Sequence, residues 1–161
     1  RFIQAVHSVV PLDDSFQFYF AVGDNWEIIN NISYPSYNIW TASSRDGIHL
    51  VDKKIAIDCN PDNLEYRIGR PRVYQSNDKF IMNYTFGTLD GRYLAGQASS
   101  CDLNTWERTD KLFPLTPSQD GWDSLHLSYP AVISTFSGRK FMFYNGNNMG
   151  YDGFGYAELV N

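Results

Sequence analysis

A pattern that returns at a fixed interval constrains this chain more than any other feature of its sequence. Pro71 and Pro130 are 59 residues apart, and so are Ala98 and Ala157. In each copy the proline lies in a first apolar segment, a second segment follows, and the alanine lies in a third. The segments are residues 70–73, 80–84 and 93–98 in one copy, and 129–132, 141–144 and 153–157 in the other. A fixed period of this length with several short strands per unit indicates the blades of a β-propeller.

A fainter copy precedes these two, with segments at residues 7–10, 16–20 and 37–42. Polar turn sequences separate the segments, as expected where hairpins join antiparallel strands. Fourth strands are expected at residues 48–51 and 105–108, and a helical turn is expected only within residues 24–32. We therefore predict an all-β fold, a single partial β-propeller domain over residues 1–161. Its blades of four antiparallel strands cover about residues 1–58, 59–115 and 116–161, and three blades do not close a ring.

Composition and charge exclude several classes of function. The net charge is −5, and no basic cluster exceeds Lys53-Lys54, whereas binding of nucleic acid requires a basic surface. No apolar run approaches the roughly 20 residues that span a bilayer. Cys59 and Cys101 form neither a disulfide framework nor a metal motif, so two isolated thiols are expected rather than one disulfide. No metal triad, P-loop or dinucleotide fingerprint occurs, and we expect no metal and no cofactor. Since the chain opens on Arg1 rather than Met, its natural N-terminus is expected further upstream, and no signal peptide is visible.

Aromatic side chains are abundant, with 11 Tyr, 11 Phe and 4 Trp making up 16% of the chain. An aromatic ring packs well against the apolar face of a sugar, so this composition agrees with carbohydrate binding. Aromatic residues are also favoured in strands and fill the space between blades. For any single aromatic ring, a place in the core is therefore expected in preference to a ligand-binding role.

Polar residues gather just before the first strand of each unit. In a propeller these first strands line the central axis, and ligands bind at the mouth where the strands begin. The substrate-binding candidates are the residues that reach this mouth, together with two amides at the end of a second strand: His7, Arg70, Trp122, His126, Tyr129, Asn145 and Asn147. Purely structural roles remain open for some of them. A histidine often forms a hydrogen bond with the backbone, and Asn-Gly is a strong hairpin signal.

Two carboxylates are also placed at this mouth. Cleavage of a glycosidic bond requires one acid to protonate the leaving oxygen and a second carboxylate to activate water or attack carbon. Glu65 and Asp123 are the best-placed pair and are our catalytic candidates, while Arg70 is expected to hold a carboxylate ionised or to bind sugar or phosphate oxygens. The alternatives are that Asp123 caps a turn and that Glu65 pairs with Arg67 or Arg70.

Taken together, residues 65–73, 121–124, 129–132, 143–147 and 153–157 resemble one group of proteins. They are similar to the glycosidase-like five-bladed β-propellers of the glycoside hydrolase family 43 and 32 type, in particular a bacterial branch found with polysaccharide-biosynthesis enzymes. The resemblance covers roughly residues 7–159 and implies five blades, of which this chain holds the C-terminal three. It also implies an Asp on the first blade as base or nucleophile, which would lie outside this sequence. Glu65 would match the acid and Asp123 a carboxylate that orients the sugar or sets a pKa.

Three hypotheses follow for the function. The first is a carbohydrate-active enzyme, similar to a glycoside hydrolase, with a sugar-containing ligand as its partner. The second is a non-catalytic glycan-binding or scaffold domain, or an inactive fragment that keeps the mouth but not the chemistry. The third is a folding unit whose open blade edges are covered by a second copy in a homodimer, since uncovered strand edges and apolar faces favour association.

Overall fold

The computed structural model describes residues 3–160, which form strands and three short 3₁₀ helices. The strands are β1 (Ile3–Pro11), β2 (Phe16–Ile29), β3 (Ile32–Ser44), β4 (Val51–Ile57), β5 (Glu65–Ser76), β6 (Lys79–Thr88), β7 (Tyr93–Ser100), β8 (Glu107–Arg108), β9 (Ser128–Ser134), β10 (Lys140–Asn145) and β11 (Phe154–Glu158). The 3₁₀ helices are η1 (Pro61–Asn63), η2 (Asp110–Leu112) and η3 (Asn148–Gly150). The all-β prediction is confirmed. No helix in this part of the chain is long and apolar enough to cross a membrane.

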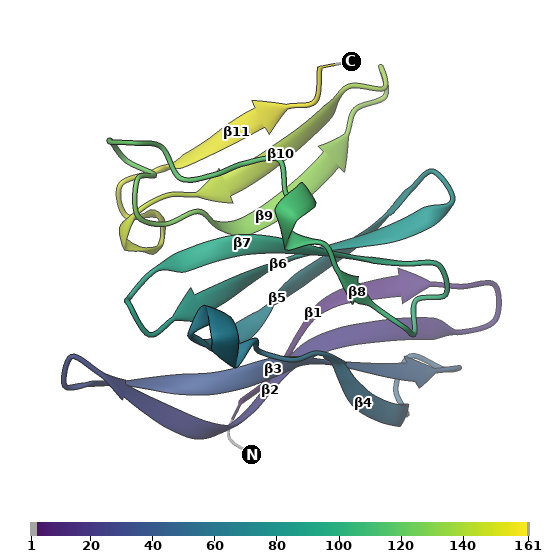
Figure 1. Cartoon of the computed structure of the whole chain (residues 1–161). Coiled ribbons are helices and arrows are strands. Elements are labelled where there is room, and N and C mark those ends of the chain that lie inside the picture. The colour runs from purple at the N-terminus through teal and green to yellow at the C-terminus, as the bar shows by residue number, and fades with distance from the viewer. Residues whose placement is uncertain (1–2, 161) are drawn as a thin grey trace.

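The strands form three successive antiparallel meanders, which Figure 1 shows as sheets placed one after another. The first contains β1 to β4 and the second contains β5 to β8, with one parallel bridge between Tyr37 and Arg67 linking them. The third contains β9, β10 and β11. We call them blades 1, 2 and 3. No sheet closes on itself within the described residues.

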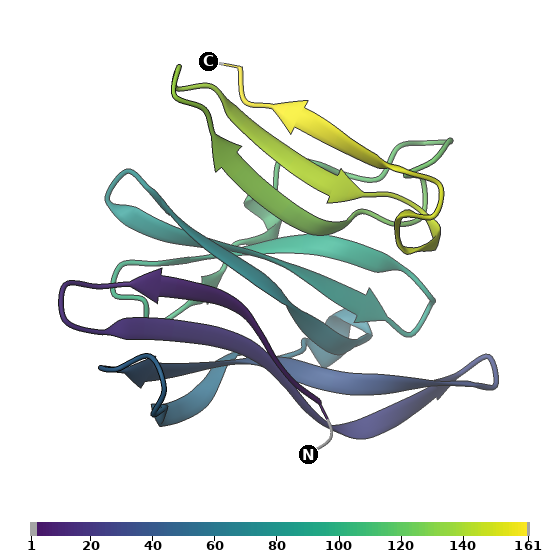
Figure 2. The same cartoon turned by 180° about the vertical axis from the view of Figure 1, so that it is seen from behind.

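The first strands of the three blades lie next to one another. β1 contacts β5, and β5 contacts β9, although long segments of chain separate them. Figure 2 shows β1 beside β5 on the side of the molecule that faces the viewer. This is the arrangement expected when first strands surround a common axis.

Apolar side chains from facing sheets fill the space between blades. Between blades 1 and 2, Tyr19, Ile39, Ile68 and Met82 are completely buried, because alternate residues of each strand point to the same face. The buried Tyr19 hydroxyl donates a hydrogen bond of 2.6 Å to the carbonyl of Leu103, so its polar end is satisfied. A smaller core between blades 2 and 3 contains Phe113, Leu127 and Met142.

Two local predictions were wrong. Residues 24–32 form no helical turn, because β2 and β3 continue as a long hairpin whose turn residues Asn30 and Asn31 adopt φ values of 51° and 63°. The fourth strand of blade 1 begins at Val51 rather than residue 48. Its start is delayed because the Asp46 carboxylate accepts hydrogen bonds from the backbone N–H groups of Ile48 and His49, which holds these residues in a turn. Both cysteines are free, as expected.

Candidate functional site

Each first strand carries an irregularity at the same place in its blade. In β1, His7 is an extra residue between Val6 and Ser8, which pair with consecutive residues of β2. In β5 the register shifts between Gly69 and Arg72. In β9 it shifts at residues 129–130, opposite the step from Phe143 to Asn145. A β-bulge of this kind redirects a side chain and is common beside functional sites.

The bulges of blades 2 and 3 hold their backbone in an uncommon conformation. Arg70 and Tyr129 have φ values of 55° and 57°, in the left-handed region that bulky side chains rarely occupy. Both residues precede a buried proline. The Tyr129 N–H also donates a 2.8 Å hydrogen bond to the Thr85 Oγ1, which fixes the strained residue to blade 2. Such strain persists where its surroundings hold it in place, and it clusters at ligand sites.

The three bulges meet at one cavity. His7, Arg70 and Tyr129, each from a different blade, line a cavity of about 230 Å³ together with Arg72 and Ala131. We call it the bulge pocket. The structure thus brings together three of the substrate-binding candidates. Arg72 was not among them; it follows the bulge on the same strand, and the structure places it in the lining beside Arg70.

The bulge pocket is cationic. The Arg70 guanidinium carbon lies 5.1 Å from the centroid of the Tyr129 ring, and Arg72 Nη1 donates a 3.1 Å hydrogen bond to the carbonyl of His7. Burial, with the charges of Arg70 and Arg72 adding to it, lowers the pKa of His7 to about 4. The imidazole is therefore neutral near pH 7 and can either donate or accept a hydrogen bond.

A cluster of aromatic rings stands behind the pocket wall. The Tyr129 ring meets the Tyr93 ring edge-on, with centroids 5.6 Å apart, and the Tyr93 hydroxyl lies 3.1 Å from that of Tyr37. The guanidinium of Arg67 lies over the Tyr93 ring at 4.5 Å. Burial raises the pKa of Tyr93 well above its ordinary value, so the phenol stays neutral.

Glu65 lies at the start of β5 but does not line the bulge pocket. Its side chain is fully buried, and each carboxylate oxygen accepts a 2.8 Å hydrogen bond from Arg108. The backbone N–H of Asn60 donates a further 2.8 Å bond, and Arg108 also binds Asp110. Burial alone would lower the pKa of Arg108, but its hydrogen bonds to the Glu65 carboxylate and the charge of Asp110 raise it above its ordinary value. The expected alternative, an ion pair of Glu65, is present with Arg108 rather than with Arg67 or Arg70.

Asp123 is also buried and also outside the lining of the pocket. It accepts a 3.0 Å hydrogen bond from the Tyr144 hydroxyl, and the Trp122 ring stacks on Tyr144 at 5.5 Å. Gly146 and Gly155 leave room for this indole, since a Cβ on either would collide with it. The catalytic roles of Glu65 and Asp123 stay predictions.

The remaining candidates organise the loop before β9. Asn147 Oδ1 accepts hydrogen bonds of 2.9 Å from the backbone N–H groups of Leu125 and His126, and its Nδ2 donates to the carbonyl of Gly121. His126 Nε2 lies 3.3 Å from the carbonyl of Gly91, and Asn145 pairs with Ser128 beside the blade 3 bulge. None of these candidates lines the bulge pocket.

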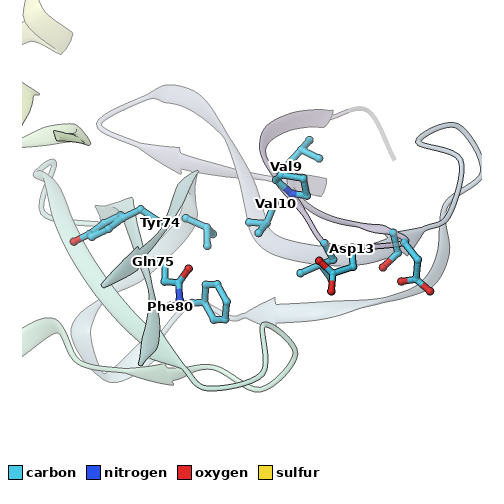
Figure 3. A pocket seen from close by; sticks show the side chains of 11 residues that line it. Val9, Val10, Asp13, Tyr74, Gln75 and Phe80 are labelled. Atoms are coloured by element: carbon cyan, nitrogen blue, oxygen red, sulfur yellow. The ribbon is translucent and has the colours of Figure 1, made fainter. Parts of the chain in front are cut away.

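A larger cavity of about 540 Å³ lies further along β1 and β5, toward the ends of these strands. Figure 3 shows Gln75 and Phe80 on the side of blade 2, with Val9 and Asp13 on the side of blade 1. No pattern in the sequence predicted this cavity. Its charged lining residues are the turn residues Asp13 and Asp14, and none of the sequence-predicted site residues lines it.

No family model matches this chain. Among curated proteins it is similar to the uncharacterised protein Rv1502 of Mycobacterium tuberculosis, with 32% identity over 121 residues. The match covers 74% of this chain and 39% of that protein. The chain therefore spans well under half the length of this relative.

Several solved structures share its arrangement of strands. A thermostable family-43 glycoside hydrolase has a TM-score of 0.68 and 16% identity, and covers 99% of this chain with 49% of its own length. Zg3597, a family 117 glycoside hydrolase of Zobellia galactanivorans, has a TM-score of 0.74 and 15% identity, over 98% of this chain and 52% of its own. The α-L-arabinofuranosidase PaAbf62A of Podospora anserina, solved with cellotriose, has a TM-score of 0.63 and 13% identity, over 95% of this chain and 52% of its own. The fold is that of the propeller-type glycoside hydrolases. This confirms the fold part of the resemblance, and the chain corresponds to about half of each of these proteins.

Proposed function

We propose that this chain is the sugar-recognition part of a carbohydrate-active β-propeller, and that the bulge pocket binds one sugar unit. The observation that carries the proposal is the convergence of His7, Arg70 and Tyr129. Equivalent positions on three blades share a bulge, two of them share a strained backbone, and all three meet at one cavity. The shared fold with glycoside hydrolases supports a carbohydrate as the ligand.

Recognition is better supported than catalysis by the described residues alone. Glycoside hydrolysis requires two carboxylates on either side of the scissile bond. The lining of the bulge pocket contains none, while Glu65 is bound by Arg108 and Asp123 by Tyr144. We therefore propose glycoside hydrolysis as the second candidate, with at least one catalytic carboxylate supplied by blades outside this chain.

The proposed architecture is a ring of about five blades. The exposed face of blade 3 supports it, since Phe154, Tyr156 and Ile133 are largely exposed there. Apolar patches of this kind normally lie against another surface. A further blade would cover them in the ring, and a second copy of the chain is the alternative.

A glycan array probed with the full-length protein tests the proposal. We expect binding to a restricted set of glycans, and this binding should be lost in Arg70→Ala and Tyr129→Ala. It should be retained in the control Tyr151→Ala, which removes an exposed ring just after η3. Glu65→Gln and Asp123→Asn should keep binding if they remain folded, because neither lines the pocket. Unchanged glycan binding in the Arg70 and Tyr129 variants would contradict the assignment of the site.

A release assay with the bound glycan distinguishes the two candidates. Reducing ends that appear with wild type and disappear in Asp123→Asn would establish hydrolysis with this carboxylate. Glycan binding without release of reducing ends by any form of the protein would support recognition and exclude hydrolysis of that glycan.

A further inference from the structure

The strand β5, which supplies both arginines of the pocket, also concentrates unpaired positive charge. Arg67, Arg70 and Arg72 all lie in β5, and none forms an ion pair with a carboxylate among residues 3–160. Three other arginines are paired, since Arg92 binds an aspartate and Arg108 and Arg139 each bind a glutamate. With 18 acidic and 13 basic residues, the chain has enough carboxylates to pair these three. Among the described arginines, Arg45 also lacks an ion pair, but only in β5 do three such arginines lie on one strand, two of them in the lining of the bulge pocket.

Arg67 is buried, so the absence of an ion pair at this residue destabilises the folded state. Its residue is only 8% exposed, and its Nε has no hydrogen-bond partner. The rings of Tyr34, Tyr66 and Tyr93 surround its guanidinium at 5.3, 5.0 and 4.5 Å. Cation–π contacts compensate part of the desolvation, but a buried charged donor without a partner remains destabilising. A buried group of this kind calls for an explanation, and a negative charge bound nearby is one that would compensate it.

The same arrangement argues against simple stacking of a neutral sugar. Tyr129 is a substrate-binding candidate, but Arg70 lies over its ring and the ring is packed edge-to-face with Tyr93. The Tyr129 hydroxyl is directed to the sulfur of Met149. What the pocket presents to a ligand is therefore mainly the guanidinium groups of Arg70 and Arg72 and the neutral imidazole of His7.

We infer that the bulge pocket selects an anionic sugar, a single pyranose that carries a carboxylate or a phosphate ester. This inference rests on the proposed function and names its substrate class. A planar guanidinium binds carboxylate and phosphate oxygens through paired hydrogen bonds, which two arginines on one face of a strand can provide together. The volume of about 230 Å³ is below the roughly 300–1,000 Å³ of pockets for larger ligands, which suits one sugar ring. The charge of Arg67 behind the wall adds to the attraction.

Titration calorimetry with the full-length protein tests the inference with four probes on a common scale: glucose, glucuronic acid, glucose 6-phosphate and inorganic phosphate. We expect at least one anionic sugar to bind roughly tenfold or more tightly than glucose, since each charge-assisted hydrogen bond favours it by about that factor. Affinity for that sugar should fall as sodium chloride rises from about 0.02 M to about 0.3 M, because salt screens the attraction. Inorganic phosphate should bind more weakly than the sugar, because it lacks the ring.

Variants separate the pocket from the overall charge. Arg70→Gln and Arg72→Gln should each reduce affinity for the anionic sugar roughly tenfold or more, whereas Arg139→Gln, an equal loss of charge at an exposed pair in blade 3, should leave it unchanged. Arg72→Lys should retain part of the affinity and its salt dependence.

The possible negative results contradict different parts of the proposal. Equal binding of glucose and the two anionic sugars would overturn the anionic preference and leave a sugar site in place. Inorganic phosphate binding as tightly as the sugars would also overturn it, because the pocket would then hold an adventitious ion only. Absence of binding by all three sugars would remove the proposed function of this pocket, and the inference with it.

Discussion

The substitution Glu65→Gln decides whether Glu65 belongs to the catalytic machinery or to the framework of blade 2. In the structure the carboxylate is fully buried and forms a two-point ion pair with Arg108 at 2.8 Å for each oxygen. Removal of one partner of a buried pair costs about 3–5 kcal/mol when the other charge is left alone. Arg108 keeps its contact with Asp110, and glutamine keeps one acceptor oxygen, so we expect a loss of about 2–3 kcal/mol in the free energy of unfolding.

Thermal unfolding of the full chain measures this loss. For a chain of this size, about 2–3 kcal/mol corresponds to a decrease of about 4–12 °C in the midpoint. Glu158→Gln is the matched control, because Glu158 and Arg139 form the same two-point geometry at the exposed edge of blade 3. An exposed ion pair contributes little to the free energy of unfolding, so the unfolding midpoint of Glu158→Gln should change by no more than about 2 °C. If Glu65→Gln unfolds at the wild-type temperature, the argument for a structural role fails, and a loss of activity in that variant would assign Glu65 to catalysis.

Three further predictions concern the bulge pocket and the thiols. His7 holds a pKa of about 4 in the folded chain, below its unfolded value of about 6.5, so the unfolded state binds the extra proton and stability falls as pH decreases from about 6.5 to 4. In urea unfolding, His7→Asn should reduce the dependence of the unfolding free energy on pH in this range. An unchanged pH dependence would contradict the lowered pKa of His7. Arg70→Gly relieves a strained φ of 55° and removes an exposed side chain, so its unfolding free energy should stay within about 1 kcal/mol of wild type while sugar binding is lost. A thiol reagent at pH 8 should modify the exposed Cys101 and spare Cys59, whose pKa burial raises to about 12, and equal labelling of both would contradict the structure.

The blade pattern could be predicted from sequence because the chain repeats a backbone feature. A residue in the left-handed region followed by a buried proline recurs at Arg70 and Tyr129, with the same spacing as the strands around it. The proline marks the bulge in each copy, so its period also locates the residue before it. In blade 1 the bulge residue His7 precedes Ser8 rather than a proline, and that copy was fainter for this reason.

The parts that could not be predicted depend on contacts between distant residues. Glu65 lies 43 residues from Arg108 in the sequence, and only the folding of β5 to β8 into one sheet brings them together. Arg67 and Arg70 are much closer along the chain, which made them the expected partners. The start of β4 was missed for a local reason, since the carboxylate of Asp46 competes with the strand for backbone N–H groups.

The repeat separates what the fold requires from what a ligand requires. Strand pairing, the bulge and the buried core recur from blade to blade, whereas the side chain at the bulge differs in every copy: histidine, arginine and tyrosine. A position that served only the fold would favour glycine or asparagine in the left-handed region, because a bulky side chain there is strained. Arginine and tyrosine at these two positions therefore carry a cost for which the backbone offers no reason. Their convergence on one cavity supplies that reason, because each blade contributes a different chemical group to the lining where we propose that a ligand binds.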